Sequence, residues 1–186
     1  MSELRTNSIV PRNGLPIGAN GGGIIQVVQV VETAQYTVTD YNFTTVMSAS
    51  IIPSRTSNKI LVMLDANIGV TQGFGAMLNL VRNSTQIYFG DQVAGQAPQV
   101  SKAITAYDPV YGIYNQTPTQ LIYLDSPNVE NVSVTYNIQL ASHSSTFSAY
   151  LNRGPTMRNG DAADGGSVRS YDAQPASTLT LMEVTN

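Results

Sequence analysis

The segment NVSVTYNIQL, residues 131–140, alternates apolar and polar side chains from end to end. Its apolar positions share one side of an extended chain: Val132, Val134, Tyr136, Ile138 and Leu140. Its polar positions share the other side: Ser133, Thr135, Asn137 and Gln139. A repeat of two residues is that of a β-strand with one buried face. The sequence therefore predicts a strand at 131–140 that packs its apolar side against a core.

The segment KILVMLDANI, residues 59–68, follows the same period with a different second face. One side is wholly apolar: Ile60, Val62, Leu64, Ala66 and Ile68. The other side mixes Leu61 and Met63 with Asp65 and Asn67. Because this second side is half apolar, we predict a strand in the middle of a sheet.

Further apolar and β-branched runs, separated by Gly, Pro, Asn and Ser, predict strands at 24–31, 34–39, 43–52, 76–82, 85–89, 100–107, 120–125, 147–151 and 178–184. Asn83 and Ser84 lie between two such runs and predict a hairpin of about two residues. The run that closes the chain predicts an inner strand, and no segment keeps a helical period. The expected fold is all-β, an antiparallel jelly-roll-like β-sandwich of about ten strands.

The first 23 residues, MSELRTNSIVPRNGLPIGANGGG, have a different composition. They hold too few apolar side chains to close a core, and Gly21 to Gly23 form a flexible hinge. These glycines precede a strand and no Lys-Ser/Thr pair follows them, so a phosphate-binding loop is not indicated. The sequence predicts an extended N-terminal docking arm at 1–23 and a β-sandwich head domain at 24–186.

Composition narrows the classes of partner. The chain has 186 residues, 11% of them charged, a net charge of -3 and no cysteine. Nine scattered basic residues give no concentrated positive surface, so nucleic acid is not an expected partner. No apolar run is long enough for membrane insertion, and Glu3 and Pro11 disrupt any secretory signal peptide. Without disulfides, self-association is the expected source of added stability.

Residues suited to catalysis are few. His143 is the single histidine and lies in a polar turn, which excludes a site built on two imidazoles. Asp161 and Asp164 could bind a hard cation, but their spacing does not match a calcium loop and a solvated loop is favoured. Glycan cleavage would need a pair of carboxylates, and nothing singles one out among the twelve acids, of which Asp108, Asp125, Asp161 and Asp164 are the ones to test. We expect no enzyme activity, no cofactor and no bound metal.

A cluster of aromatic and amide residues surrounds an Asp-Pro turn: Tyr107, Tyr111, Tyr114, Asn115 and Gln116. Flat rings beside amides suit the faces and hydroxyls of sugars. Tyrosine is equally favoured in strands and at subunit interfaces, where packing alone explains it. The cluster thus has two interpretations, a glycan site or a packing interface, and packing is favoured.

Six segments carry a family resemblance: SELRTNSIVPRNGLP, GGGIIQVVQV, PSRTSNKILVM, YLDSPN, YLNR and STLTLMEV. In their order along the chain, they resemble small tail-fibre-like virion structural proteins of tailed bacteriophages of marine bacteria and cyanobacteria. The resemblance implies a non-enzymatic, homotrimeric jelly-roll head, made in the host cytoplasm without a signal peptide. It also implies localisation in the virion, where the arm docks the head to other virion proteins.

Within the arm, the expected docking residues are apolar anchors and two charged contacts: Leu4, Ile9, Val10, Pro11, Leu15, Arg5 and Arg12. The resemblance suggests a tail-fibre or appendage protein that contributes to host attachment, with a host surface glycan as a candidate ligand. Capsid-surface decoration, or an adaptor in the same kind of virion, uses the same parts. A free carbohydrate-binding β-sandwich module is a further alternative.

Overall fold

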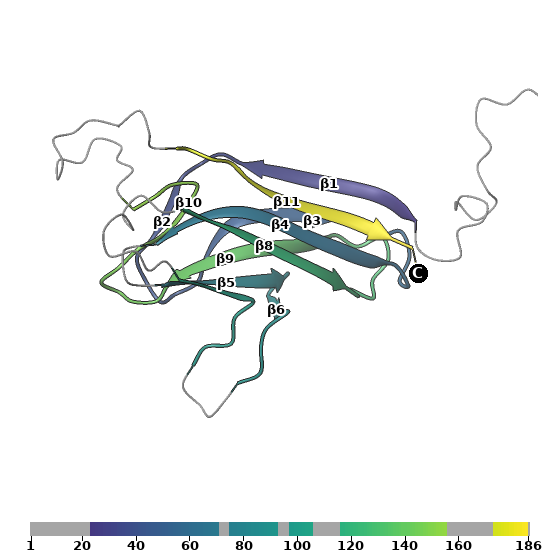
Figure 1. Cartoon of the computed structure of the whole chain (residues 1–186). Helices are drawn as coiled ribbons and strands as arrows, with labels where there is room; N and C mark the ends of the chain where they lie inside the picture. Colours follow the sequence, from purple (N-terminus) through teal and green to yellow (C-terminus); the bar gives the residue numbers. More distant parts are fainter. Residues whose placement is uncertain (1–22, 71–74, 93–96, 106–115, 156–172, 186) are drawn as a thin grey trace, which may run out of the picture.

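The chain forms strands in two antiparallel sheets in a computed structural model, which describes residues 23–70, 75–92, 97–105, 116–155 and 173–185 (Figure 1). The strands are β1 Ile24–Glu32, β2 Tyr36–Val38, β3 Thr44–Ile51, β4 Lys59–Val70, β5 Gly75–Arg82, β6 Thr85–Ile87, β7 Lys102–Thr105, β8 Gln116–Asp125, β9 Val134–Ser142, β10 Ala149–Leu151 and β11 Ser177–Val184. The described residues contain no helix. The prediction of an all-β, two-sheet sandwich is confirmed.

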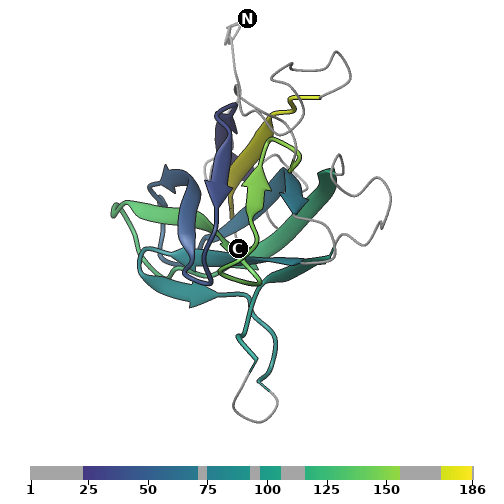
Figure 2. The same cartoon turned by 90° about the vertical axis from the view of Figure 1, so that its left-hand side faces the viewer.

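Sheet A contains β1, β11, β4 and β8, in that order across the sheet, and β10 and β2 extend it alongside the end of β4. Sheet B has the order β3, β9, β5, with β6 and β7 both on the outer side of β5. In Figure 2, turned by 90° from Figure 1, β1 and β11 lie above and β5 lies below. The core fills the space between the two sheets.

The eight strands of four or more residues pair from the ends of the chain inward. β1 pairs with β11, β3 with β9, β4 with β8 and β5 with β7, each antiparallel. The first and third of these pairs lie in sheet A and the other two in sheet B. Most contacts therefore join residues far apart in sequence, which makes the fold depend on long-range register.

β4 is central, as its sequence predicted. Its inward side chains are at most 2% exposed, and β4 has β8 on one side and β11 and β10 on the other. β11 lies between β1 and β4, so the prediction of an inner final strand is confirmed as well. The hairpin prediction is also confirmed, because Arg82 pairs with Thr85 and Asn83 adopts a φ of 54°.

One part of the 131–140 prediction is wrong. β9 begins at Val134, and Val132 is 56% exposed although Tyr136, Ile138 and Leu140 are fully buried. The reason is the turn at Asn131, which has a φ of 56° and donates its N–H to the carbonyl of Pro53. Because this left-handed residue stands directly before it, Val132 still belongs to the turn, and the regular alternation begins only at Val134.

Candidate functional site

Most of the predicted site residues lie outside the described part of the chain. This holds for the whole set of arm contacts and for most of the aromatic cluster: Leu4, Arg5, Ile9, Val10, Pro11, Arg12, Leu15, Tyr107, Tyr111, Tyr114 and Asn115. Gln116 is described, and it begins β8. Its Nε2 donates to the carbonyl of Ala173 at 2.8 Å, which ties the start of β8 to the segment before β11.

Of the other candidate residues predicted from sequence, two lie outside the described part of the chain and one lies within it. Asp161 and Asp164 lie outside the described residues, whereas His143 is exposed and follows β9. The backbone N–H of His143 donates to the carbonyl of Gly75. Within the described ranges, no group of three or more His, Cys, Asp or Glu side chains could hold a metal ion. The same ranges contain no helix that is long and apolar enough to cross a membrane.

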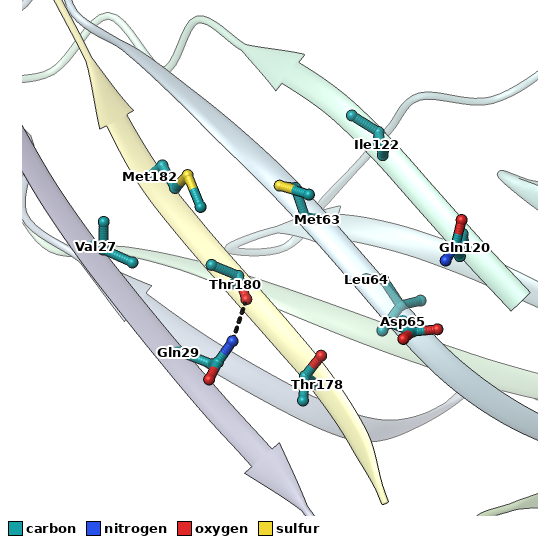
Figure 3. Close-up of a pocket in the computed structure, with 10 residues that line it drawn as sticks. All are labelled: Val27, Gln29, Met63, Leu64, Asp65, Gln120, Ile122, Thr178, Thr180 and Met182. Carbon is teal, nitrogen blue, oxygen red and sulfur yellow. Dashed lines mark hydrogen bonds between the residues drawn. The ribbon is translucent and has the colours of Figure 1, made fainter. Parts of the chain in front are cut away.

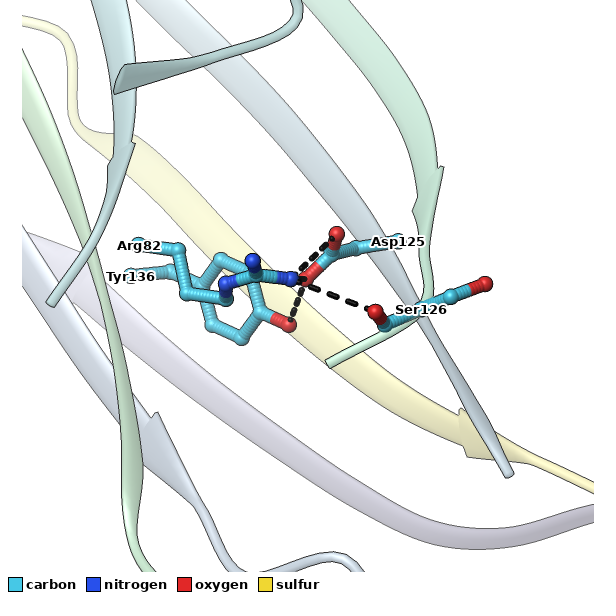
Figure 4. A network of polar contacts seen from close by, with 4 residues as sticks. All are labelled: Arg82, Asp125, Ser126 and Tyr136. Carbon is cyan, nitrogen blue, oxygen red and sulfur yellow. Dashed lines mark hydrogen bonds and ion pairs between the residues drawn. The ribbon is translucent and has the colours of Figure 1, made fainter. Parts of the chain in front are cut away.

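Asp125 is a buried carboxylate that links the two sheets (Figure 4). Arg82 Nη1 donates to both carboxylate oxygens at 2.9 Å, and the Tyr136 hydroxyl donates to Oδ2 at 2.6 Å. Asp125 belongs to β8 in sheet A, while Arg82 and Tyr136 belong to β5 and β9 in sheet B. Burial, and then the hydrogen bond to Asp125, raises the pKa of Tyr136 well above its ordinary value of 10.0. The cluster therefore clamps the sheets together with a tyrosine that stays protonated.

This clamp gives a prediction for alkaline pH. Tyr136→Phe should lower the free energy of unfolding by about 1 to 3 kcal/mol below pH 10, because Asp125 loses a buried donor. Above pH 10 the unfolded wild type releases the Tyr136 proton while the folded state keeps it. Wild-type stability then falls by up to about 1.4 kcal/mol per pH unit, and the gap to the variant narrows. Denaturant unfolding of both proteins from pH 8 to 11 measures this, and a constant gap would contradict it.

A second buried carboxylate fixes the turn before β4. Glu183 of β11 is 1% exposed, and its Oε1 accepts from Ser54 N at 2.7 Å, Ser54 Oγ at 2.8 Å and Asn58 Nδ2 at 2.6 Å. The segment PSRTSNK is thus held against the last strand. Like Asp125, Glu183 has its acceptor oxygen occupied by protein donors, which is the arrangement of a structural carboxylate.

The least usual surface of the head is the outer face of sheet A. β1, β11, β4 and β8 lie side by side there (Figure 1). Their outward residues align in three cross-strand rows. The rows are Val27, Met182, Leu61 and Leu124; Gln29, Thr180, Met63 and Ile122; and Val31, Thr178, Asp65 and Gln120. The first row is wholly apolar, and Asp65 is the single charged residue of the three rows.

Several of these apolar side chains are open to solvent. Val27 is 55%, Ile122 59% and Leu124 46% exposed. Val27 and Ile122 line a groove of about 460 Å³ that runs across all four strands (Figure 3). Gln29 donates to Thr180 within it at 2.9 Å. None of the residues that line this groove is aromatic. Half of the lining residues are polar, namely Gln29, Asp65, Gln120, Thr178 and Thr180. The exposed apolar side chains gather at the other end, along the first row and its neighbours Met63 and Ile122, and such a patch marks a contact surface for another macromolecule.

The outer face of sheet B has the opposite character. The outward residues of β3 and β9 are polar and hydrogen-bond across the strands: Ser48 with Asn137 at 2.6 Å, Ser50 with Thr135 at 2.8 Å, and Gln139 with Thr45 at 3.4 Å. An antiparallel sheet with one solvated face is expected to alternate in this way. Sheet A departs from the pattern, because seven of the twelve outward residues in its three rows are apolar.

The sequence alone indicated part of the apolar outer face of sheet A. The half-apolar second side of 59–68 and the run IIQVVQVV both show strands with two apolar faces. What could not be read was which strands share a sheet, since the rows join residues more than 100 positions apart. Comparison with models of known protein families and with the sequences of curated proteins finds no match.

Proposed function

We propose that this chain is a non-enzymatic structural protein of a tailed-bacteriophage virion, in which an N-terminal arm docks a self-associating β-sandwich head. The observation that carries the proposal is the difference between the two outer faces of the sandwich. On one face, β3 and β9 are polar and hydrogen-bonded to each other, and on the other an apolar row crosses four strands. A head of this kind is built to be covered by protein in an assembly.

The pairing of the strands supports the jelly-roll part of the proposal. In a jelly roll, eight strands form two Greek keys and pack as two sheets. Here the eight strands of four or more residues pair in nested order: the first with the last, the second with the second-last, and so on. Successive pairs alternate between sheet A and sheet B. This is the pairing that results when one long hairpin of strands wraps around a core.

The point at which the arm joins the head also supports docking. Gly23 N donates to Thr185 Oγ1 at 2.8 Å, and Thr185 N donates to the Gly23 carbonyl at 3.0 Å. Gly23, the last residue of the predicted arm, is thereby fixed beside the last strand, at the end of sheet A nearest the apolar row. Because Gly23 is fixed to the head, binding of the arm would also fix the position of the head. Its affinity would come from main-chain pairing and a few apolar pockets.

Within the virion, the features fit a tail-fibre or appendage head and a capsid-surface decoration or adaptor protein equally, because both need an anchor and an assembly face. The carbohydrate-binding module is less well supported. The groove on sheet A has no aromatic side chain for a sugar ring to stack on. Asp125, one of the acids considered for glycan cleavage, is occupied by Arg82 and Tyr136.

Deletion of residues 1–22 tests the docking role. Particles of a phage that encodes the chain should carry the full chain, detected by mass spectrometry of the purified tail and capsid fractions. We expect the shortened chain to enter particles at less than about a tenth of the wild-type level, because the anchor contributes most of the binding free energy. Serine at Leu4, Ile9, Val10 and Leu15 should reproduce the loss in a chain of full length.

The control is the unfolding transition of each variant, measured outside the particle. It should match that of wild type, so that loss from particles reports docking and not misfolding. Equal incorporation of the shortened and full chains, or absence of the wild-type chain from every particle fraction, would contradict the proposed function.

A further inference from the structure

We infer that the outer face of sheet A binds a second copy of this chain, so that the head is a homo-oligomer built on Val27, Met182, Leu61, Leu124, Met63 and Ile122. This inference rests on the proposed function in that it names the partner at the assembly face. It concerns the head alone and holds whatever the arm binds.

The chemistry of the face favours a like partner. The three rows hold one charge, Asp65, and Lys59 lies one row beyond them on the same side of β4, so a partner chosen by opposite charge would find little to recognise. Without an aromatic ring along the groove, stacking on sugars or bases is not provided. What the face offers is aliphatic and thioether surface, which gains free energy by contact with similar surface. The same face of a second copy supplies such surface in return. Another apolar hollow of the described head, of about 390 Å³, lies beside β5 and β7 and is lined by Met77, Val100 and Ala103 among others.

The edges of sheet A point to the same partner. β1 pairs with β11 alone and β8 with β4 alone among the described strands, so both are edge strands that flank the face. Ile24, at the start of β1, is 57% exposed. Beside β8, Tyr88 stacks on Tyr123 with ring centroids 5.0 Å apart, and Phe89 is 48% exposed. An apolar edge strand open to solvent invites aggregation unless it is covered.

The area fits a stable contact when face and edge are combined. Four strands about 4.8 Å apart and three rows about 6.8 Å apart give a flat area of roughly 400 Å². A standard interface takes about 800 Å² from each partner. The face supplies about half of this to one contact, and in a ring each copy also buries an edge strand against the face of a second neighbour. Repetition of that contact closes a ring, for which the trimer is our expected size.

The competing occupant is the chain's own segment 1–22, which joins the head at Gly23, near the first row. If it filled the groove of its own head, the chain would be a monomer. The mass of the full chain therefore separates the two occupants.

The test uses the full chain in sedimentation equilibrium at several concentrations, with two double variants. V27K/I122K adds one lysine to each edge of the face, at side chains more than half exposed in the single head. T45K/S50K adds the same charge to the outer face of sheet B, where both residues are exposed. Circular dichroism and thermal unfolding establish that each variant is folded. The single variants V27K and I122K decide the question if the double variant does not fold.

We expect wild type and T45K/S50K to have three times the chain mass of 19.9 kDa. V27K/I122K should be a folded monomer at the same concentrations, with association weakened at least about a hundredfold by two buried charges. A wild-type monomer would overturn the inference and assign the face to segment 1–22 or a foreign partner. A V27K/I122K oligomer of wild-type mass would place the interface elsewhere. Neither result bears on incorporation of the arm into particles, so the two proposals can fail separately.

Discussion

Asn152→Ala should lower the free energy of unfolding by about 3 to 5 kcal/mol, a large part of the stability of a domain of this size. Asn152 is fully buried, and its Nδ2 donates to the carbonyls of Glu32 at 2.8 Å and Ala34 at 3.0 Å. Its Oδ1 accepts from the Ser177 hydroxyl at 2.6 Å. Alanine leaves all three partners without this bond, and the Ser177 hydroxyl among them is fully buried.

The backbone adds to the cost. Asn152 has a φ of 60°, which asparagine tolerates better than alanine does. Two matched variants separate the terms. Asn152→Gly removes the same hydrogen bonds and relieves the backbone, so it should keep most of the loss. Asn128→Ala places alanine at a φ of 55° on the surface, and should cost about 1 kcal/mol.

Denaturant unfolding at one fixed protein concentration measures these differences, since the stability of an oligomer depends on concentration. If Asn128→Ala were as damaging as Asn152→Ala, backbone strain and not the buried hydrogen bonds would explain the effect.

Asp125→Ala should destabilise the head by a similar amount, about 3 to 5 kcal/mol, because it removes one partner of a buried ion pair. Arg82 would lose its bonds to both carboxylate oxygens, and the Tyr136 hydroxyl would lose its acceptor inside the core. Asp125→Asn keeps an acceptor of the same shape and should cost less. Asp40→Ala is the surface control, since Asp40 is exposed and bonded to Asn42, and should change stability by under about 0.5 kcal/mol.

A double-mutant cycle distinguishes a clamp from separate contributions. Asp125→Ala combined with Tyr136→Phe should cost clearly less than the sum of the two single variants, because the second change no longer breaks a bond. Additive losses would mean that Asp125 and Tyr136 do not stabilise the sheets through one shared interaction.

Local patterning was enough to predict the strands of this head. β4 follows from alternation alone, since every inward residue of 59–68 is apolar, whereas the inward side of the final run combines Leu179 and Leu181 with the buried Glu183. The error at Val132 has a local cause that alternation does not encode, the left-handed turn at Asn131. Residues that tolerate a positive φ can end a strand in the middle of a regular pattern.

The site was less accessible to sequence. Val27, Leu61, Leu124 and Met182 become neighbours through pairings that span most of the chain. None of them stands out alone, because an exposed aliphatic residue is ordinary. They form one apolar row only because of the strand register, which no local pattern specifies. The buried roles of Asn152 and Glu183 were hidden for the same reason, since their partners lie in distant segments.

If copies of the chain meet on sheet A, the polar outer face of sheet B is left to face the solvent or the host. A covered face tolerates few charged substitutions, whereas the Ser, Thr, Asn and Gln positions of β3 and β9 can change with little effect on the core. The outer face of sheet A would then serve assembly, and the outer face of sheet B would stay exposed.

The most direct measurement of this account is the rate at which peroxide oxidises individual methionines in the native full chain. Met63 and Met182 lie in the groove on sheet A and are partly exposed in a single head, whereas Met47 is 3% exposed in the core. Oxidation follows exposure, and mass spectrometry assigns it to each residue. The account predicts that Met63 and Met182 are oxidised several-fold more slowly in wild type than in V27K/I122K, with Met47 slow in both. Equal rates at Met63 and Met182 in the two proteins would show that the face is open in the native protein, and would contradict the account.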